Sequence, residues 1–208
     1  MEPTKCCYIV GAGVFCAAGL HPAPGDLVIA ADGGYRYLQQ MGLNTDLVIG
    51  DFDSMSSLPR HPHVVVLPKE KDDTDMAAAI QLGLKQGCSE FRLYGGTGGR
   101  ESHTLANFQC LVWLARRGLR GVLVGTGWEA TAVTDGVLAF SVDHRGYISV
   151  FCQGDRAEGV TLHGLKYPLN EATLTCDIPL GVSNEFTGVE SSVAVRHGTL
   201  LVLYDSRL

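Results

Sequence analysis

A change of pattern near residue 127 constrains this chain more than any other feature. Before it, short apolar runs alternate with segments of helical period, and the runs are Cys7–Val10, Leu27–Ala30, Leu47–Ile49, Val64–Leu67, Phe91–Tyr94 and Val122–Val124. Such runs indicate buried strands, and helices between them indicate a parallel sheet with helical crossovers. We therefore expect residues 1–127 to form an α/β domain with a Rossmann-like parallel sheet.

Three segments between these runs predict helices that end at glycines. They are Tyr35–Met41 before Gly42, Asp73–Gln86 before Gly87, and Ser102–Arg117 before Gly118. A glycine after the last periodic residue is a common helix stop, because it adopts a left-handed conformation at little cost. The stripes expected to face inward are Met76, Ile80 and Leu84 in the second helix and Leu105, Phe108, Val112 and Ala115 in the third.

After residue 127 the helical period disappears. The remaining runs are short and rich in β-branched residues: Val137–Val142, Tyr147–Cys152, Val160–His163, Ala172–Cys176, Val193–Arg196 and Leu200–Tyr204. Three dipeptides between them have the composition of hairpin turns, namely Asp135-Gly136, Arg145-Gly146 and His197-Gly198. Residues 128–208 are therefore expected to form a smaller antiparallel β-sandwich.

Composition narrows the function classes. The chain has 208 residues, 46% of them apolar, which is too apolar for a disordered protein. A net charge of −6 argues against nucleic acid or an anionic membrane as the partner. No apolar run approaches the ~18 residues that a membrane span requires. Seven cysteines without a C-x-x-C pair indicate free thiols in a reducing compartment, so we expect a cytoplasmic protein.

Two acidic clusters follow predicted strands, where parallel sheets hold their ligands. Asp32, Gly33 and Gly34 come after the second strand, and by themselves they also fit an ordinary turn. Asp51 and Asp53 come after the third strand, where residues i and i+2 of an extended chain point the same way. Two adjacent carboxylates favour a hard cation such as Mg²⁺ between them, with a solvated acidic loop as the alternative.

A third cluster, Lys71-Asp72-Asp73-Thr74-Asp75, opens the second predicted helix. Asp72 as the N-cap and acids in the first turn would serve the helix alone. Three acids in four positions exceed that need, however. We therefore expect Asp72 and Asp75 to complete the metal site that Asp51 and Asp53 begin.

The fourth cluster, Gly95-Gly96-Thr97-Gly98-Gly99-Arg100, lies between a strand and the third predicted helix. Exposed backbone amides, a helix N-terminus and an arginine together suit phosphates. The segment is not a P-loop, because no Gly-Lys-Ser/Thr follows. Gly11-Ala12-Gly13 is not a dinucleotide fingerprint either, because Cys16 stands at the position of the third glycine. The clusters thus predict Mg²⁺–nucleotide chemistry, and nothing indicates NAD.

Together these motifs resemble those of the thiamine pyrophosphokinase family. The resemblance includes Ala31–Gly34, Asp46–Ser54, Lys71–Asp75 and Gly95–His103, and in the C-terminal part Gly164–Leu169 and Gly181–Phe186. The last of these segments, taken alone, fits an ordinary connection. The resemblance implies a homodimeric enzyme that transfers a pyrophosphoryl group from ATP to the hydroxyl of thiamine and releases AMP.

The resemblance also assigns roles to residues of this chain. It implies Asp51, Asp53, Asp72 and Asp75 as Mg²⁺ ligands and, with Arg100, as catalytic residues. It implies nucleotide binding by Asp32, Gly33, Gly34, Thr74, Gly96, Thr97, Gly98, Gly99 and His103. It places thiamine at the subunit interface near Ser183, Asn184 and Phe186.

One position departs from the family pattern, because Ser102 stands where the family has an acid, and Glu101 lies one position earlier. Ser102 is expected to cap the third helix. Two alternatives to the kinase follow. The acceptor could be another heteroaromatic alcohol, such as a hydroxymethylpterin, or the chain could bind nucleotide or thiamine without catalysis.

Overall fold

The computed structural model describes residues 4–52, 58–68, 70 and 72–206. The chain divides into two compact units, one made of residues 1–107 and 123–126 and the other of residues 108–122 and 127–208. Helix α3 (Glu101–Ala115) and strand β6 (Arg120–Val124) contribute residues to both units. Each unit is described separately below.

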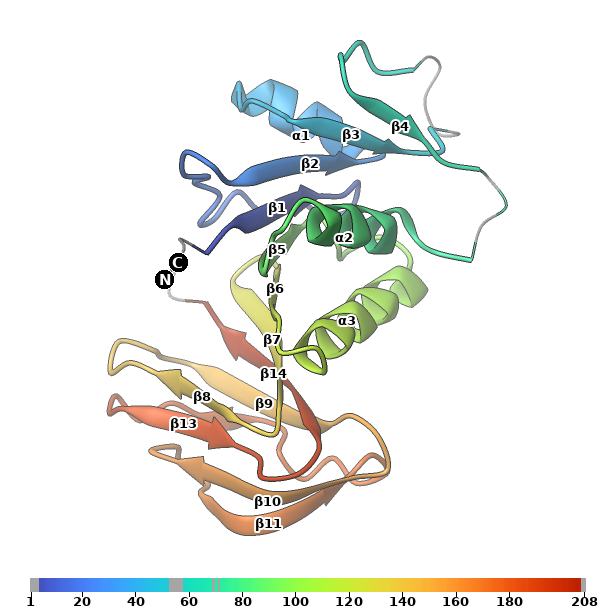
Figure 1. Cartoon of the computed structure of the whole chain (residues 1–208). Coiled ribbons are helices and arrows are strands. Elements are labelled where there is room, and N and C mark those ends of the chain that lie inside the picture. The colour runs from blue at the N-terminus through green and yellow to red at the C-terminus, as the bar shows by residue number, and fades with distance from the viewer. Residues whose placement is uncertain (1–3, 53–57, 69, 71, 207–208) are drawn as a thin grey trace. The chain divides into compact units, whose positions relative to one another are not determined.

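The first unit is built on parallel strands, as the alternation of runs and helices predicts. Their order is β5-β1-β2-β3-β4, and they are β1 (Cys6–Val10), β2 (Leu27–Ala31), β3 (Leu47–Gly50), β4 (Val64–Val66) and β5 (Glu90–Tyr94) (Figure 1). The expectation that all runs are buried is wrong for β4, where Val65 and Val66 are exposed. In the unit's sheet β4 is the edge strand and pairs only with β3, so part of its surface stays open to solvent.

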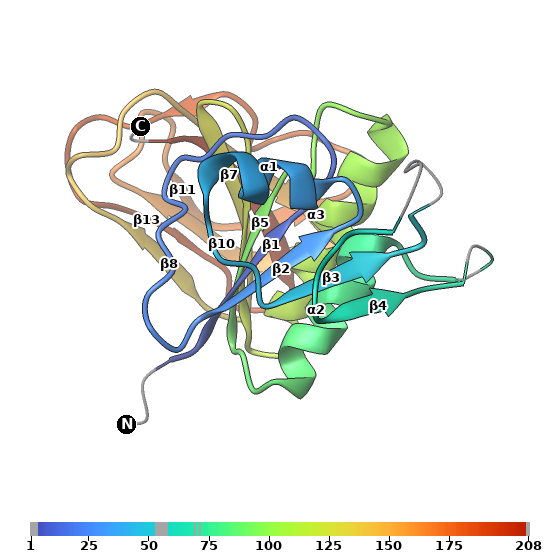
Figure 2. The ribbon, with the colours of Figure 1, turned by 90° about the horizontal axis from the view of Figure 1, so that it is seen from above.

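Helices α1 (Gly34–Met41) and α2 (Asp75–Lys85) cover opposite faces of this sheet (Figure 2). Helix α1 ends as predicted at Gly42, which has φ +65°. Helix α2 begins two residues later than expected, and its N-cap is Thr74 rather than Asp72. The backbone of Thr74 is extended, and its hydroxyl accepts a hydrogen bond of 3.1 Å from the amide of Ala77.

The buried stripe of α3 differs from the prediction. Leu105, expected to face inward, is 61% exposed, whereas Leu111, Val112 and Leu114 are buried. The reason lies in β6, where Gly121 has no side chain and Leu111 and Leu114 fill the space above it. Ser102 is not a cap either, because α3 begins at Glu101 and Ser102 lies within its first turn.

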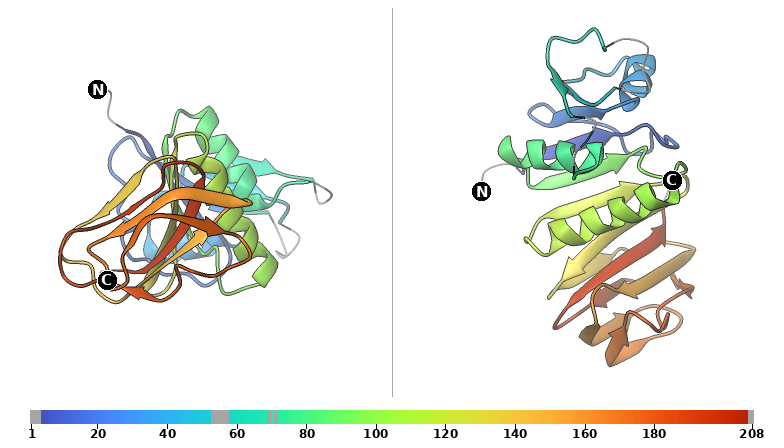
Figure 3. Two further views of the ribbon diagram at one scale, coloured as in Figure 1. Left: turned by 90° about the horizontal axis from the view of Figure 1, so that it is seen from below. Right: turned by 90° about the vertical axis from the view of Figure 1, so that its right-hand side faces the viewer.

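Besides its residues of α3 and β6, the second unit consists of antiparallel strands, and no described residue from 128 to 206 is helical (Figures 1 and 3). Strands β12, β9, β14 and β7 are neighbours in one sheet, and β11, β10, β13 and β8 form the other. Their bounds are β7 (Trp128–Thr134), β8 (Val137–Phe140), β9 (Tyr147–Cys152), β10 (Arg156–His163), β11 (Leu169–Thr175), β12 (Asn184–Glu185), β13 (Ser191–Ala194) and β14 (Thr199–Asp205). Strand β7, whose alanines and glutamate have low strand propensity, and the two-residue β12 were not predicted from the sequence.

The three predicted hairpin turns are wrong. Asp135-Gly136 lies between β7 and β8, Arg145-Gly146 between β8 and β9, and His197-Gly198 between β13 and β14. In each case the two strands that the turn connects lie in different sheets, so they do not form a hairpin. Turn composition is local, so it marks where the chain reverses without specifying the partner strand. Buried side chains of both sheets, such as Phe140, Ile148 and Val202, belong to one hydrophobic cluster.

None of the seven cysteines, all of which lie in the described part of the chain, forms a disulfide. Cys6, Cys7, Cys88 and Cys152 are buried, and Cys176 is exposed. Burial raises the pKa of the Cys6 thiol to about 11, so this group stays protonated and unreactive near neutral pH. Among the described residues, no helix is long and apolar enough to cross a lipid bilayer.

Candidate active site

A pocket of about 410 Å³ lies where β1, β2, β3 and β5 end. Every residue that lines it belongs to the first unit. Strands β1 and β5 are neighbours, and the pocket lies beside the loops that follow them. The strand order changes direction here, because β2, β3 and β4 lie on one side of β1 and β5 lies on the other. Ligands of open parallel sheets bind at such a change of strand order. The lining residues are Gly11, Ala12, Gly13, Ala31, Asp32, Asp51, Thr74, Asp75, Met76, Gly95, Gly96, Thr97, Gly99, Arg100, His103, Thr104 and Asn107.

The loops after β1 and β5 are hydrogen bonded to each other along one wall of the pocket. The amide of Gly13 donates to the carbonyl of Gly95 at 2.8 Å, and the amide of Val14 donates to that of Thr97 at 2.7 Å. A Cβ on Gly13 would lie 2.7 Å from the Gly95 oxygen, so the close approach requires glycine. The hydroxyl of Tyr37 on α1 donates to the Gly13 carbonyl at 3.0 Å. The parallel pairing of β1 and β5 is thus continued beyond the strands into the pocket wall.

Three carboxylates line the same pocket, from three different elements. Asp32 follows β2, Asp51 follows β3, and Asp75 is the first residue of α2. Asp32 has φ +48°, and the buried Phe52 next to Asp51 has φ +54°. Left-handed backbone is costly for residues other than glycine and gathers at functional sites, where the surrounding structure holds it. The amide of Asp32 is held by the carbonyl of Ile49 at 2.8 Å.

The charges of the pocket are mixed. Arg100 and the N-termini of α2 and α3 supply positive potential, which favours anions. The three carboxylates would repel a polyphosphate unless a cation were bound between them. The pocket therefore suits a phosphate ligand that arrives with a divalent cation.

Not every predicted residue lies in this pocket. Gly33 and Gly34 form the start of α1 and are absent from the lining, as is Gly98, whose φ is +72° and which packs against Val14. Asp72 lines a neighbouring pocket of about 460 Å³ with Asp73. Asp53 lies outside the described residues.

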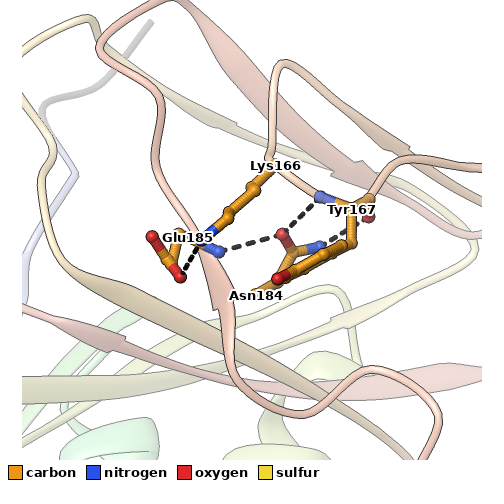
Figure 4. Close-up of polar contacts among 4 residues, drawn as sticks. All are labelled: Lys166, Tyr167, Asn184 and Glu185. Atoms are coloured by element: carbon orange, nitrogen blue, oxygen red, sulfur yellow. Dashed lines mark hydrogen bonds and ion pairs between the residues drawn. The ribbon is translucent and has the colours of Figure 1, made fainter.

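The loop predicted to contact thiamine lies in the second unit and is organised by Asn184 (Figure 4). Asn184 is 3% exposed, and its Nδ2 donates to the carbonyl of Tyr167 at 2.7 Å. Its Oδ1 accepts from the amides of Tyr167 and Glu185, both at 2.9 Å. Lys166 forms an ion pair of 2.6 Å with Glu185, and this hydrogen bond raises the pKa of Lys166. Asn184 thus fixes the backbone that presents Tyr167, whose side chain is 57% exposed.

The neighbours of Asn184 differ in exposure. Phe186 is buried and its ring lies 5.4 Å from that of Phe140, so it belongs to the core. Ser183 is exposed, with φ +58°, and its amide donates to the hydroxyl of Ser149 at 3.1 Å. Of the three predicted substrate-binding residues, Ser183 is therefore the exposed one.

Comparison with known proteins decides the family. Residues 23–123 match the thiamin pyrophosphokinase catalytic domain, and residues 138–200 match the vitamin B1 binding domain of the same enzymes. The chain belongs to the thiamine pyrophosphokinase family. The predicted resemblance is thereby confirmed.

Individual members of the thiamine pyrophosphokinase family resemble this chain over most of their length. The thiamine pyrophosphokinase of Bacillus subtilis (strain 168) is 28% identical over 184 residues, which cover 85% of this chain and 86% of that protein. A crystal structure of the Bacillus subtilis protein superposes with a TM-score of 0.87 at 26% identity, covering 98% of this chain and 100% of the other. The Geobacillus thermodenitrificans structure gives 0.82 at 26% identity, covering 97% and 98%.

Sequence reasoning missed several lining residues of this thiamine pyrophosphokinase family member. Gly11 and Gly13 were considered only as a dinucleotide fingerprint, although they follow a strand as the predicted clusters do. Thr104 and Asn107 were missed as well, although a signal was present. Together with Arg100 and His103 they follow the spacing of one helix face, which would have identified them.

Proposed function

We propose that this chain is an ATP-dependent thiamine pyrophosphokinase, which converts thiamine and ATP into thiamine diphosphate and AMP. The observation that carries the proposal is the pocket at the strand ends. It combines Asp32, Asp51 and Asp75 with a glycine-rich loop and Arg100 inside the region that matches the family's catalytic domain. This combination suits transfer of a phosphoryl group, which is catalysed by positioning and by stabilising charge.

In the proposed reaction, the hydroxyl oxygen of thiamine attacks the β-phosphorus of ATP. The bond between the β-phosphorus and the oxygen that bridges it to the α-phosphate breaks, and AMP leaves with that oxygen. The proton of the hydroxyl passes to a carboxylate, and we consider Asp51 and Asp72, two of the residues that the family resemblance makes catalytic, as its acceptor. Asp51 lines the pocket, which favours it over Asp72. Arg100 and the amides of the glycine-rich loop would stabilise the charge on the phosphate oxygens.

Mg²⁺ fits the donor set of this pocket. No group of three or more acidic, histidine or cysteine side chains that could hold a metal occurs among the described residues. Mg²⁺ in nucleotide sites is held by one or two carboxylates together with phosphates and water, so such a group is not required. Asp51 and Asp75 would hold the ion here, and Asp53 and Asp72 remain predicted ligands. When bound, Mg²⁺ neutralises charge on the transferred group.

We place thiamine at the second unit, in a homodimer whose subunit interface lies near Ser183 and Tyr167. The region belongs to the part of the chain that matches the vitamin B1 binding domain. Tyr147, Tyr167 and Val182 are apolar side chains on or beside this loop, and they are 58%, 57% and 43% exposed. A partner subunit and a heteroaromatic substrate would both cover such surface.

The proposal also assigns functional domains and a compartment. Residues 1–127 would form the Rossmann-like catalytic domain and residues 128–208 the thiamine-binding sandwich, whose two sheets share one hydrophobic cluster. Buried thiols such as those of Cys6 and Cys7 suit the reducing cytoplasm.

The decisive test is AMP release from Mg-ATP by the purified protein, with and without thiamine, with the product identified by mass. Thiamine-dependent AMP together with thiamine diphosphate is expected. If AMP were formed only with a hydroxymethylpterin, the acceptor would be that alcohol instead of thiamine, and the reaction would still be pyrophosphoryl transfer from ATP. Binding of both ATP and thiamine without formation of AMP would favour the alternative that the chain binds these ligands without catalysis.

Ser102→Asp restores the acid of the family pattern and tests the departure at this position. Ser102 is exposed in the first turn of α3, where an acid also interacts favourably with the helix N-terminus. We expect kcat/KM for ATP to stay the same or to rise by up to about threefold, in line with one exposed charge. A loss of more than tenfold would show that Ser102 or Glu101 has a role of its own.

A further inference from the structure

Asn107 is a buried polar side chain in the wall of the pocket. It lies on α3 and is 4% exposed. Its Nδ2 donates to the carbonyl oxygen of Gly96 at 2.7 Å. A buried amide stabilises a fold little compared with an apolar side chain of the same size. We therefore expect the main role of Asn107 to be its effect on the conformation of Gly96.

The hydrogen bond fixes the orientation of one peptide group. Gly96 approaches so closely that a Cβ on it would lie 2.8 Å from Nδ2 of Asn107. A trans peptide is planar, and its carbonyl and its N–H point in opposite directions. The carbonyl of Gly96 and the amide of Thr97 belong to the same peptide. With the carbonyl held by Asn107, the N–H of Thr97 points away from that side chain.

The neighbouring carbonyls are held in a similar way. The carbonyl of Gly95 accepts from the amide of Gly13, and the carbonyl of Thr97 accepts from the amide of Val14. Three successive carbonyls of the glycine-rich loop are therefore engaged by donors of the protein. A carbonyl oxygen that faced a phosphate would repel it, whereas backbone N–H groups attract it.

We propose that Asn107 is a positioning residue for phosphate binding. It withdraws the Gly96 carbonyl from the ligand and so leaves the amide edge of the 96–97 peptide for the phosphates of the nucleotide. The inference rests on the proposed function for the identity of the ligand, a nucleoside triphosphate. It adds a residue outside the predicted set of site residues, and it explains why the helix carries a polar group at a buried position.

The test compares Asn107→Leu and Asn107→Asp with a matched control, Thr131→Val. Thr131 is 6% exposed, and its hydroxyl donates to the carbonyl of Gly121 at 2.7 Å. The control thus removes the same kind of buried bond to a glycine carbonyl, at a residue that does not line the pocket. Leucine removes the donor at similar volume, and an ionised aspartate places an acceptor against the Gly96 carbonyl.

The readouts are the KM values for ATP and thiamine, the affinity for a non-hydrolysable Mg-ATP analogue by calorimetry, and the melting temperature. We expect Asn107→Leu to weaken nucleotide binding about tenfold and Asn107→Asp to weaken it further, with KM for thiamine unchanged. Thr131→Val should melt earlier but bind nucleotide as the wild type does. A merely structural Asn107 would behave like Thr131, with a lower melting temperature and unaltered nucleotide affinity, and that result overturns the proposal.

The failure of the proposed function is distinguishable from the failure of this inference. A wild-type protein that binds the Mg-ATP analogue but forms no AMP with thiamine would refute the enzyme assignment. The effect of Asn107→Leu on analogue binding would still decide the role of Asn107. A wild-type protein that binds no nucleotide would overturn both.

Discussion

Asp75→Asn should lower kcat by about 10²–10³-fold while the protein keeps its fold. Asp75 lines the pocket as the first residue of α2, where its carboxylate would hold the cation that accompanies the triphosphate. Asparagine has nearly the same shape but lacks the charge. Loss of one electrostatic contact to the transferred group typically costs an enzyme this factor. The measurement is AMP formation at saturating ATP and thiamine, repeated over a range of Mg²⁺ concentrations.

Asp73→Asn is the matched control for this variant. Asp73 lies two residues before Asp75, accepts a hydrogen bond of 3.0 Å from Gln81, and lines the neighbouring pocket instead. Both changes remove one negative charge near the N-terminus of α2, worth about 0.5 kcal/mol of stability. Similar melting temperatures with activity lost only in Asp75→Asn are expected. If Asp75→Asn retained more than a tenth of the wild-type rate, Asp75 would not be a ligand of the cation.

Gly34→Ala should have the largest effect on stability, a loss of about 3 kcal/mol or more in the free energy of unfolding. Gly34 opens α1 directly against the end of β1, and a Cβ there would overlap the carbonyl of Val10 and lie 2.9 Å from that of Gly11. Both obstacles are backbone, which cannot rotate away as a side chain does. Overpacking against a rigid neighbour belongs to the most destabilising classes of substitution.

Urea denaturation followed by circular dichroism measures this effect, with Gly99→Ala as the control. A Cβ on Gly99 would meet nothing within 4 Å, so its unfolding free energy should stay within about 0.5 kcal/mol of the wild type. Recovery of the Gly34→Ala variant only as aggregate would also agree with a large loss of stability. A midpoint close to that of Gly99→Ala would show that the start of α1 can move away from β1.

The parallel strands were predictable because each is a short apolar run bounded by turn residues. The carboxylates were predictable for a related reason, since Asp32 and Asp51 directly follow such runs and the strand ends of a parallel sheet meet at one edge. The N-cap of α2 was not predictable, because several residues near a helix start compete for this position, and Thr74 has the extended backbone that a cap requires. Sequence spacing alone does not decide between two residues, two positions apart, that can both cap a helix.

The remaining errors concern contacts between segments far apart in the chain. The side chain of Asn107 is hydrogen bonded to the carbonyl of Gly96, and neither residue type predicts this contact. The orientation of α3 depends on Gly121, a glycine six residues after its end. The dipeptides at 135–136 and 197–198 were recognised as turns, but their strands pair elsewhere. In each case the deciding information is the shape of a distant surface.

These turns between sheets have a consequence for how the second unit comes apart. Because β7, β8 and β9 alternate between the sheets, as do β13 and β14, neither sheet is a contiguous stretch of chain. No continuous segment can therefore detach with its own sheet intact and leave the other behind. We therefore expect the unit to unfold in one cooperative step. In a hydrogen-exchange experiment its slowest-exchanging amides, such as Ile148 in one sheet and Val193 in the other, should then report the same free energy of opening.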